Sequence, residues 1–180
     1  MEKDRELVIR AKQGDVQAFA DLYEGIYRDL YRFAVYTLRN EADAEDTVSE
    51  TVTDAFASIH RLRDEHAFRG WMFGILSNKC KVRIREYTRK SISLEDAEGE
   101  MKVAEDLTEQ LHIRHLFRRL SEEERLIISL HVFGGYTSRE IGSLLKMNAN
   151  TVRTKESRAL KKLAQDYDND TGVKGSGGQH

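Results

Sequence analysis

Residues 134–163 read GGYTSREIGSLLKMNANTVRTKESRALKKL, a pattern typical of two helices joined by a short turn. The double glycine interrupts any helix before it. Thr137 and Glu140 stand three residues apart, as in a capping box in which a hydroxyl and a carboxylate cover free amide hydrogens. A first helix is therefore predicted from about Ser138, with apolar residues on one face and Gly142 allowing a neighbouring helix to approach closely.

The second helix of this stretch has an N-cap in Asn148. Its inward residues are expected to be Val152, Ala159, Leu160 and Leu163. Its outward face is expected to be polar and mainly basic, with Arg153, Thr154, Lys155, Ser157, Arg158, Lys161 and Lys162. Because a basic helix of this kind fits the major groove of DNA, the stretch is predicted to be a helix-turn-helix with a recognition helix.

Composition favours an all-α protein. With 180 residues, of which 39% are hydrophobic, the chain has room for one domain or two small ones, and it contains no proline. A single cysteine excludes an internal disulfide and suits a reducing compartment. No apolar run approaches the about 20 residues that span a bilayer, and the N-terminal residues are too charged for a signal peptide. The protein is expected in the cytoplasm, without membrane insertion.

The formal net charge of −2 conceals a strong segregation of charge. Residues 1–60 carry −6 and residues 61–90 carry +6, while residues 91–110 carry −6 and residues 111–163 carry +6. A basic face attracts phosphate whatever the overall sum. The alternation therefore indicates two separate contacts with a polyanion.

Apolar spacing predicts helices on both sides of an acidic segment. Residues 7–36 fit two helices broken near Gly14, residues 42–62 fit a helix with an acidic outer face, and residues 68–90 fit a long helix with a basic polar face. At residues 91–106 the periodicity fails and acid dominates, which marks a flexible linker.

Four helices are predicted beyond this linker, in residues 107–163, one of them starting at a second capping box between Ser121 and Glu124. Residues 164–180 are polar and glycine-rich and are expected to be disordered. The prediction is an all-α protein of two small helical domains, residues 1–90 and 107–163, joined by a flexible acidic linker.

Several separated motifs follow one another in an order typical of one family. They are Gly14-Asp15 with Ala18-Phe19, Asp43-Ala44-Glu45-Asp46, Phe68-Arg69-Gly70-Trp71-Met72-Phe73-Gly74-Ile75 leading to Asn78, and Thr151-Val152-Arg153-Thr154-Lys155 with Ser157-Arg158-Ala159. Over roughly residues 5–163 the chain resembles a bacterial sigma factor of the extracytoplasmic-function (ECF) group of the sigma-70 family. The N-terminal half looks like sigma region 2 and the C-terminal half like region 4.

The chain departs from the usual family pattern at four positions. The family usually has glutamine where Ser49 stands, aspartate at Val82, glycine at Lys146 and an apolar residue at Glu156. Lys146 is expected to adopt a positive φ at a cost of about 1 kcal/mol. Glu156 is expected to weaken the positive field of the recognition helix.

The resemblance implies that region 4 reads the duplex −35 element of a promoter. It assigns this contact to Thr151, Arg153, Thr154, Lys155, Ser157, Arg158, Lys161 and Lys162. An arginine that contacts guanine through two hydrogen bonds discriminates by about 1–3 kcal/mol, whereas a lysine is better placed to hold phosphate.

The resemblance also implies that region 2 melts and reads the −10 element as a single strand. It assigns this contact to Arg61, Arg63, Phe68, Trp71, Asn78, Lys79, Lys81, Arg83 and Arg85. It assigns polymerase binding to Asp43, Asp46, Ser49, Glu50 and Asp54. The partners that it implies are core RNA polymerase, through its clamp and flap regions, promoter DNA and an anti-sigma factor.

Simpler interpretations remain open for single residues. Trp71 is also compatible with a place in the core, Asn78 with ordinary helix polarity, and Cys80 with an ordinary thiol. His112 and His115 are spaced so that they could touch one metal, but no further ligands cluster near them, so no metal is expected.

Two other classes of protein are compared with this interpretation of the sequence below, an enzyme and a DNA-binding regulator. An enzyme is disfavoured because the sequence shows no nucleophile, metal set or glycine-rich phosphate loop, and no cofactor is expected. The alternative is a two-domain helix-turn-helix regulator that binds duplex DNA without being a polymerase subunit, with its N-terminal domain as a sensor or dimeriser.

Overall fold

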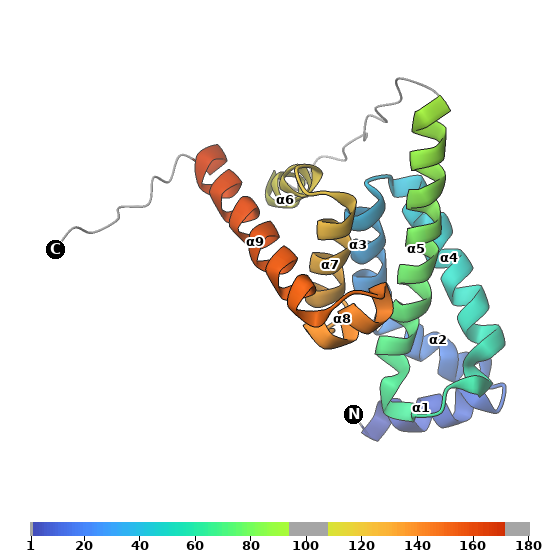
Figure 1. Cartoon of the computed structure of the whole chain (residues 1–180). Coiled ribbons are helices and arrows are strands. Elements are labelled where there is room, and N and C mark those ends of the chain that lie inside the picture. Colours follow the sequence, from blue (N-terminus) through green and yellow to red (C-terminus); the bar gives the residue numbers. More distant parts are fainter. Residues whose placement is uncertain (1, 94–107, 172–180) are drawn as a thin grey trace.

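The computed structural model describes residues 2–93 and 108–171, and the part it describes is helical, without strands. Figure 1 shows helices α1 to α5 gathered on one side and α6 to α9 packed against them. The predicted all-α fold of two helical units is confirmed. Residues 94–106 of the predicted linker and residues 172–180 of the predicted tail lie outside the described residues.

The first 38 residues form three helices, one more than predicted. They are α1 (Glu2–Lys12), α2 (Val16–Glu24) and α3 (Tyr27–Leu38). The break near Gly14 occurs as predicted, with Gly14 at φ +93° and the Asp15 side chain accepting a hydrogen bond from the Ala18 amide. The second break, at Ile26, was missed because the apolar three-to-four spacing continues across it. Ile26 leaves the helical region at φ −123°.

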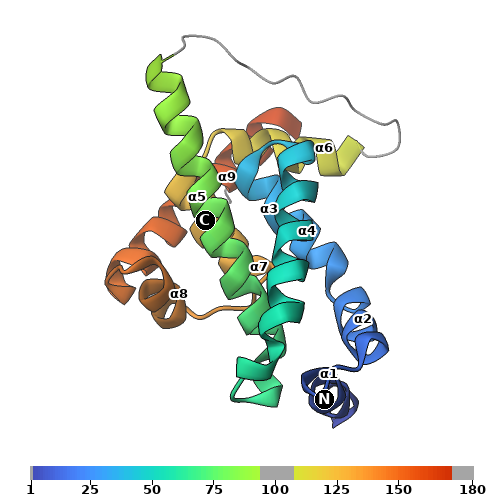
Figure 2. The same cartoon turned by 90° about the vertical axis from the view of Figure 1, so that its right-hand side faces the viewer.

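Two long helices that run side by side in opposite directions follow (Figure 2). They carry most of the residues predicted to bind polymerase and the −10 element. The elements of this part are α4 (Glu41–Ser58), the short 3-10 helices η1 (Ile59–Arg61) and η2 (Glu65–Ala67), and α5 (Phe68–Ser93). Asn40 caps α4 by accepting from the Asp43 amide at 3.0 Å. Helix α5 passes the predicted boundary at residue 90, because neither glycine nor proline follows Gly74 until Gly99.

The C-terminal unit consists of four helices, as predicted. They are α6 (Thr108–Arg118), α7 (Glu122–Val132), α8 (Ser138–Leu145) and α9 (Ala149–Thr171). Both predicted capping boxes are present. At α7 the Ser121 amide donates to Glu124 at 2.9 Å, and at α8 the Thr137 amide donates to Glu140 at 2.8 Å. The starts of these helices are therefore fixed by local side chains.

The turn between α8 and α9 is tight and depends on two residues. Lys146 ends α8 in the left-handed region, at φ 58° and ψ 45°, which confirms the positive φ predicted for it. Gly142 lies so close to the turn that an added Cβ would stand 2.7 Å from the Met147 carbonyl oxygen. Asn148 then accepts from the Asn150 amide at 2.8 Å and begins α9. The helix-turn-helix geometry is thus specified within about ten residues.

The prediction of a disordered tail from residue 164 is wrong for residues 164–171, which continue α9. No glycine or proline interrupts the sequence between Leu163 and Gly172. In addition, Arg119 forms an ion pair with Asp166 at 2.7 Å, which ties this last part of α9 to the end of α6.

The two helical units share one hydrophobic core. Helix α7 packs against α3 and α5 of the N-terminal unit and against α9 of its own unit. Leu126 and Leu130 of α7 belong to the same buried cluster as Phe33 of α3 and Phe73 of α5. In the described structure the C-terminal unit is therefore docked on the N-terminal one, an arrangement that the sequence did not predict.

The close approach at Gly142 generates a stability prediction. Gly142→Ala should lower the free energy of unfolding by about 1–3 kcal/mol, because the Cβ would collide with backbone that cannot move without disturbing the turn. The measurement is urea denaturation followed by circular dichroism. Gly25→Ala is the control, because its Cβ would lie an ordinary 3.5 Å from the Leu22 oxygen. Equal effects of the two changes would contradict the role given to Gly142.

Candidate nucleic-acid and polymerase surfaces

The outer face of α9 presents most of the residues predicted for duplex DNA. Thr151, Arg153, Thr154, Ser157, Arg158 and Lys161 are all exposed. They recur at the spacing of one helix face, and the preceding turn fixes the direction in which that face points. The structure therefore brings these predicted residues together on one surface that is open to a partner.

Two lysines of α9 behave differently, because they are held by α7. Lys155 lies 2.6 Å from Glu123, and Lys162 lies 2.7 Å from Glu124. Surface ion pairs of this kind contribute about 0–1 kcal/mol each to stability. Their main effect here is positional, because they hold α9 along α7 and reduce the positive charge that these two lysines offer to phosphate.

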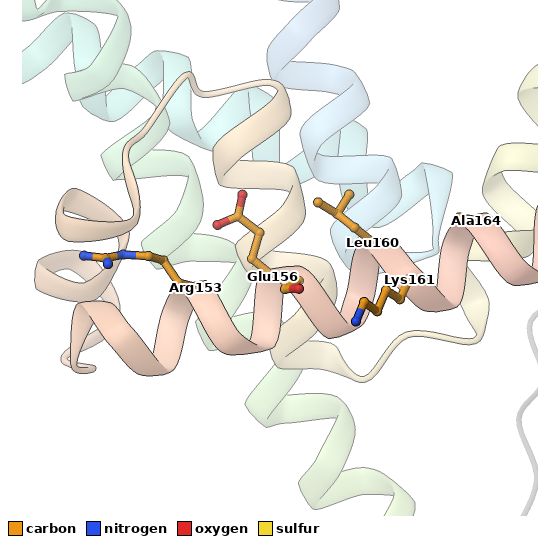
Figure 3. Close-up of a pocket in the computed structure, with 6 residues that line it drawn as sticks. Arg153, Glu156, Leu160, Lys161 and Ala164 are labelled. Carbon is orange, nitrogen blue, oxygen red and sulfur yellow. The ribbon is translucent and has the colours of Figure 1, made fainter.

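Glu156 points towards α7 and α8, although it lines the same hollow as Arg153 and Lys161, so the expected weakening of the positive field stays a prediction. Its side chain is only 13% exposed and lies 3.4 Å from His131 of α7, and it accepts a hydrogen bond from Ser138 of α8 at 3.3 Å. Figure 3 shows Glu156 and Lys161 pointing to different sides of the helix. The carboxylate joins α7, α8 and α9, three of the four helices of the unit.

Leu160 was predicted to point inward, but it is 47% exposed. The prediction failed because Ala159 and Leu163 already provide the inward stripe of α9, and Leu160 falls beside it. Leu160 lies on the rim of a shallow hollow of about 390 Å³ (Figure 3). The hollow is lined by Arg153, Glu156, Ser157, Leu160, Lys161 and Ala164.

The basic face of α5 is partly neutralised by α4. Lys79 lies 2.6 Å from Asp54 and 3.5 Å from Glu50, and Arg83 lies 2.8 Å from Glu50. Asn78 and Arg85 are exposed. Two residues predicted to bind polymerase thus pair with two residues predicted to bind DNA, which the sequence could not reveal.

These ion pairs line a groove of about 590 Å³ between α4 and α5. Its apolar part comes from Ile75 and Val82, and Val82 is one of the exposed large hydrophobic residues. Asn78 stands at the same groove, with a donor and an acceptor on one amide. An apolar floor beside an amide and cations suits the face and edge of an unstacked base.

Lys81, on the same helix, contacts the C-terminal unit. Its ammonium donates to the carbonyl oxygen of Leu144, in α8, at 2.9 Å. Burial, together with the nearby charges of Arg85 and Lys146, lowers the pKa of Lys81. Lys81 was predicted to contact the −10 element, and in the structure its ammonium is already hydrogen-bonded to the C-terminal unit.

The connector between α4 and α5, together with the start of α5, contains both exposed and buried residues. Arg61 and Arg63 are exposed. Phe68, in contrast, is only 5% exposed, and its ring packs edge-on against Phe19 at 6.1 Å. Trp71 is half-buried at 6.2 Å from Phe68. Phe68 thus belongs to the core beneath this surface in the structure, and Trp71 lies at its boundary.

The acidic face of α4 carries the residues predicted to bind polymerase. Asp46 and Ser49 are exposed, while Asp43 accepts a hydrogen bond from the Tyr87 hydroxyl of α5. Burial and the Asp43 carboxylate raise the pKa of Tyr87. With Glu50 and Asp54 engaged by α5, Asp46 and Ser49 are the members of the set that are most open to a partner.

The residues that join the two units could not be predicted from the sequence. Arg69 donates to the Phe133 carbonyl at 2.6 Å, and the Tyr136 hydroxyl donates to the Gly70 carbonyl. Arg125 is buried in α7 and donates to Thr37 of α3 at 3.4 Å. A motif search over one segment cannot find such pairs, because their partners lie more than 60 residues away.

Residues 2–93 and 108–171 include no grouping of three or more metal-ligating side chains. No helix in these ranges is long and apolar enough to cross a membrane.

The comparisons with known proteins agree with this geometry. The family model of sigma-70 region 2 matches residues 22–90, and that of sigma-70 region 4 matches residues 110–163. The ECF RNA polymerase sigma factor SigM of Mycobacterium tuberculosis is 26% identical over 163 residues, which cover 90% of this chain and 83% of that protein. SigV of Bacillus subtilis, an RNA polymerase sigma factor, is 28% identical over 135 residues, 74% of this chain and 81% of the relative.

Two solved structures share the fold. CnrH, solved in complex with the cytosolic domain of CnrY, aligns with a TM-score of 0.66 at 24% identity, over 93% of this chain and 99% of that one. The sigma factor RpoE of Bartonella quintana, solved with the anti-sigma factor NepR, aligns with a TM-score of 0.72 at 20% identity, over 85% of this chain and 98% of that one.

A paired region 2 and region 4 define the class of sigma factors. The chain belongs to the ECF group of the sigma-70 family, whose members direct the initiation of transcription. Its relatives are sigma factors, which are not enzymes.

The ion pairs of α5 generate a testable expectation. Glu50→Gln keeps the size of the side chain but frees Lys79 and Arg83 of one carboxylate, so binding to a single-stranded oligodeoxynucleotide should tighten about two- to fivefold at low salt. Fluorescence anisotropy at several salt concentrations measures this, and the salt dependence should become steeper. Glu24→Gln on α2, which is equally a loss of one exposed carboxylate, serves as the control. Identical behaviour of the two variants would refute the restraint ascribed to Glu50.

Proposed function

We propose that this sigma factor binds core RNA polymerase through α4 and recognises a promoter at two places, with α9 on the −35 duplex and α5 on the melted −10 strand. The observation that carries the proposal is the exposed basic face of α9 in one unit, together with a second basic helix lying against an acidic helix in the other. The domains proposed are residues 1–90 for region 2 and residues 107–163 for region 4, and the last helices of the two units extend beyond them to Ser93 and Thr171.

The −35 contact rests on the chemistry of the exposed residues of α9. Arg153 and Arg158 can each hydrogen-bond a guanine edge in the major groove, and Thr154 and Ser157 can reach neighbouring bases. Lys161 is exposed and suited to a phosphate, which adds affinity and salt dependence without sequence choice. Lys155 and Lys162 reach phosphate only by giving up their glutamate partners, so they contribute less.

The −10 contact requires bases that have left the duplex. Asn78 and the groove beside it offer an amide and an apolar floor to such a base, and Arg85 is free to track the backbone. Arg61 and Arg63 extend the basic surface along the connector. Trp71 stands at the edge of the core, where its ring supports this surface from below.

Polymerase binding is assigned to the acidic face of α4, with Asp46 and Ser49 as its exposed centre. A negative face suits a positively charged partner surface and repels DNA, so it separates the polymerase side from the DNA side of the unit. The C-terminal unit is proposed to contact the flap region. The chain acts in the cytoplasm, where polymerase and promoters are, and its role needs neither metal nor cofactor.

An inhibitory protein partner is part of the proposal. RpoE was solved with the anti-sigma factor NepR, and CnrH with the cytosolic domain of CnrY. The same fold in this chain supports regulation by an anti-sigma factor.

A regulator that acts on duplex DNA without polymerase is less well supported, because region 2 would have no role in such a protein. Run-off transcription with purified core polymerase separates the two functions: a regulator gives no promoter-specific start of its own.

The role of Arg158 is tested by Arg158→Ala. Transcription from a cognate promoter should fall about tenfold or more, because the loss of one arginine contact to guanine corresponds to about 1–3 kcal/mol. Binding to core polymerase should stay unchanged in a pull-down. Arg118→Ala on α6 removes the same side chain from another exposed helix and should leave transcription intact. A parallel loss of transcription and polymerase binding would remove Arg158 from the DNA contact.

The polymerase face is tested by Asp46→Arg, which reverses an exposed charge without breaking a recorded ion pair. Affinity for core polymerase should drop about tenfold, since like charges across an interface are repulsive. Competition binding against a labelled wild-type factor measures the drop. Glu24→Arg on α2 is the matched charge reversal. The assignment fails if Asp46→Arg competes as well as this control.

A further inference from the structure

The outer side of α9 carries an exposed stripe, formed by Leu160, Ala164 and Tyr167, that is distinct from the helix's packed side. Leu160 and Tyr167 are 47% and 42% exposed, and Ala164 between them is exposed as well. The three residues are spaced by four and then by three positions, which keeps them on one line along a helix. The inward stripe of α9, with Ala159 and Leu163, is already packed against its own unit. The outer stripe is therefore a second contact surface of the same helix.

The hollow on this side of α9 has the form that a coiled coil uses to accept a side chain. In a coiled coil, a large side chain of one helix enters a hole between four residues of the facing helix, at positions i, i+3, i+4 and i+7. The hollow of about 390 Å³ includes one such set in its lining (Figure 3). The set consists of Ser157, Leu160, Lys161 and Ala164. The hollow is thus suited to a side chain from another helix.

The end of α9 is accessible to a second molecule. Figure 1 shows its last turns at the edge of the described structure. An ion pair of 2.7 Å between Arg119 and Asp166 ties the inner side of these turns to α6. Because Asp166 faces α6, its neighbour Tyr167 is directed away from the unit, in agreement with its exposure. A helix can therefore approach the outer stripe from solvent.

The charges beside the outer stripe change sign along α9. Lys161 and Asp168 are both exposed and stand seven residues apart, which is about two turns along the same flank of the stripe. Two copies of α9 that lie antiparallel bring Lys161 of each copy beside Asp168 of the other. A parallel pair would bring like charges together. Since flanking charges determine partner and orientation in coiled coils, this order favours a second copy of the same helix in the antiparallel orientation.

The same antiparallel alignment supplies a side chain for the hole. Tyr167 lies about two turns beyond the centre of the hole, so Tyr167 of each copy reaches the hole of the other. Ala164 then lies next to the twofold axis, where its small side chain allows the two helices to approach closely. Each copy both fills and is filled, as a twofold interface requires.

We propose that the chain forms an antiparallel dimer through the outer stripe of α9, and that this dimer and duplex DNA exclude each other. A contact between two helices over a few turns is small, so the dissociation constant is expected on the order of tens of micromolar. Ser157 and Lys161 belong both to the hole and to the face proposed to read the −35 duplex. The exclusion of DNA rests on the proposed function of α9, whereas the dimer does not.

The charge order is tested by sedimentation velocity of the full chain between about 1 and 300 µM. Wild type should pass from monomer to dimer. Asp168→Lys places like charges at both flanking contacts, and Lys161→Asp does so with the opposite sign, so each should weaken the association about tenfold or more. An equimolar mixture of the two variants should restore the dimer, because each lysine then meets an aspartate. Glu24→Lys on α2 is the matched charge reversal and should associate like wild type.

The contact geometry is tested by cross-linking. Under mild oxidation, Ala164→Cys should form a disulfide-linked dimer at least about fivefold faster than Gln165→Cys, because position 164 lies next to the twofold axis and position 165 points away from the stripe. Native Cys80 is 0% exposed and does not take part. Tyr167→Ala removes the side chain that fills the hole and should weaken the dimer about tenfold, whereas Tyr27→Ala, at an exposed tyrosine of α3, should not.

The competition with DNA is measured on the cross-linked Ala164→Cys dimer. Fluorescence anisotropy with a labelled duplex of random sequence should show binding at least about tenfold weaker than for the same preparation after reduction, because the dimer covers Ser157 and Lys161. Reduced protein is compared at a concentration well below the dissociation constant of the dimer. Equal affinity of the cross-linked and reduced forms would overturn the exclusion of DNA.

Three results would overturn the dimer itself. The first is a wild-type chain that stays monomeric up to about 300 µM. The second is a mixture of Asp168→Lys with Lys161→Asp that stays monomeric although wild type associates. The third is cross-linking at equal rates from positions 164 and 165. Failure of the proposed function would appear separately, as no promoter-specific run-off from wild type with core polymerase at concentrations where the monomer dominates.

Discussion

The burial of α7 between α3, α5 and α9 is the packing on which the rest of the structure depends. An 11-residue helix is marginal on its own in water, so α7 persists because Leu126, Ile127 and Leu130 enter the common core. The same helix holds α9 through ion pairs with Lys155 and Lys162. The orientation of the α9 face that is proposed to bind duplex DNA thus follows from contacts made on the opposite side of α7.

Ion pairs between neighbouring helices, as well as the segregation of charge along the chain, determine which basic side chains are open to a partner. Each basic helix forms ion pairs with acidic side chains of a neighbouring helix. The partners of α5 are Glu50 and Asp54, and those of α9 are Glu123 and Glu124. Lysines take most of these partners. Within the described ranges the exposed arginines of the two faces, Arg85, Arg153 and Arg158, have no recorded ion pair, so their guanidinium groups stay open to a partner.

The features that were predicted correctly from the sequence are those that depend on residues close together in the chain. Capping boxes, the Gly14 break and the left-handed Lys146 depend on residues within one or two turns, and all were predicted. The contacts of Glu156 with α7 and α8 were missed because helix periodicity says nothing about a hydrogen-bonding partner such as Ser138 on another helix. The docking of the two units was missed for a similar reason. It depends on pairs such as Arg125 with Thr37, which are 88 residues apart.

The absence of proline, which lets α5 run for 26 residues, also bears on how fast the factor becomes available after synthesis. Isomerisation at proline typically takes about 10–100 s and is a common slow step in folding. A chain with no proline and a single cysteine has neither that step nor disulfide formation within the chain to wait for. The slow phases that these two steps impose on the folding of many other proteins are therefore missing from the folding of this sequence.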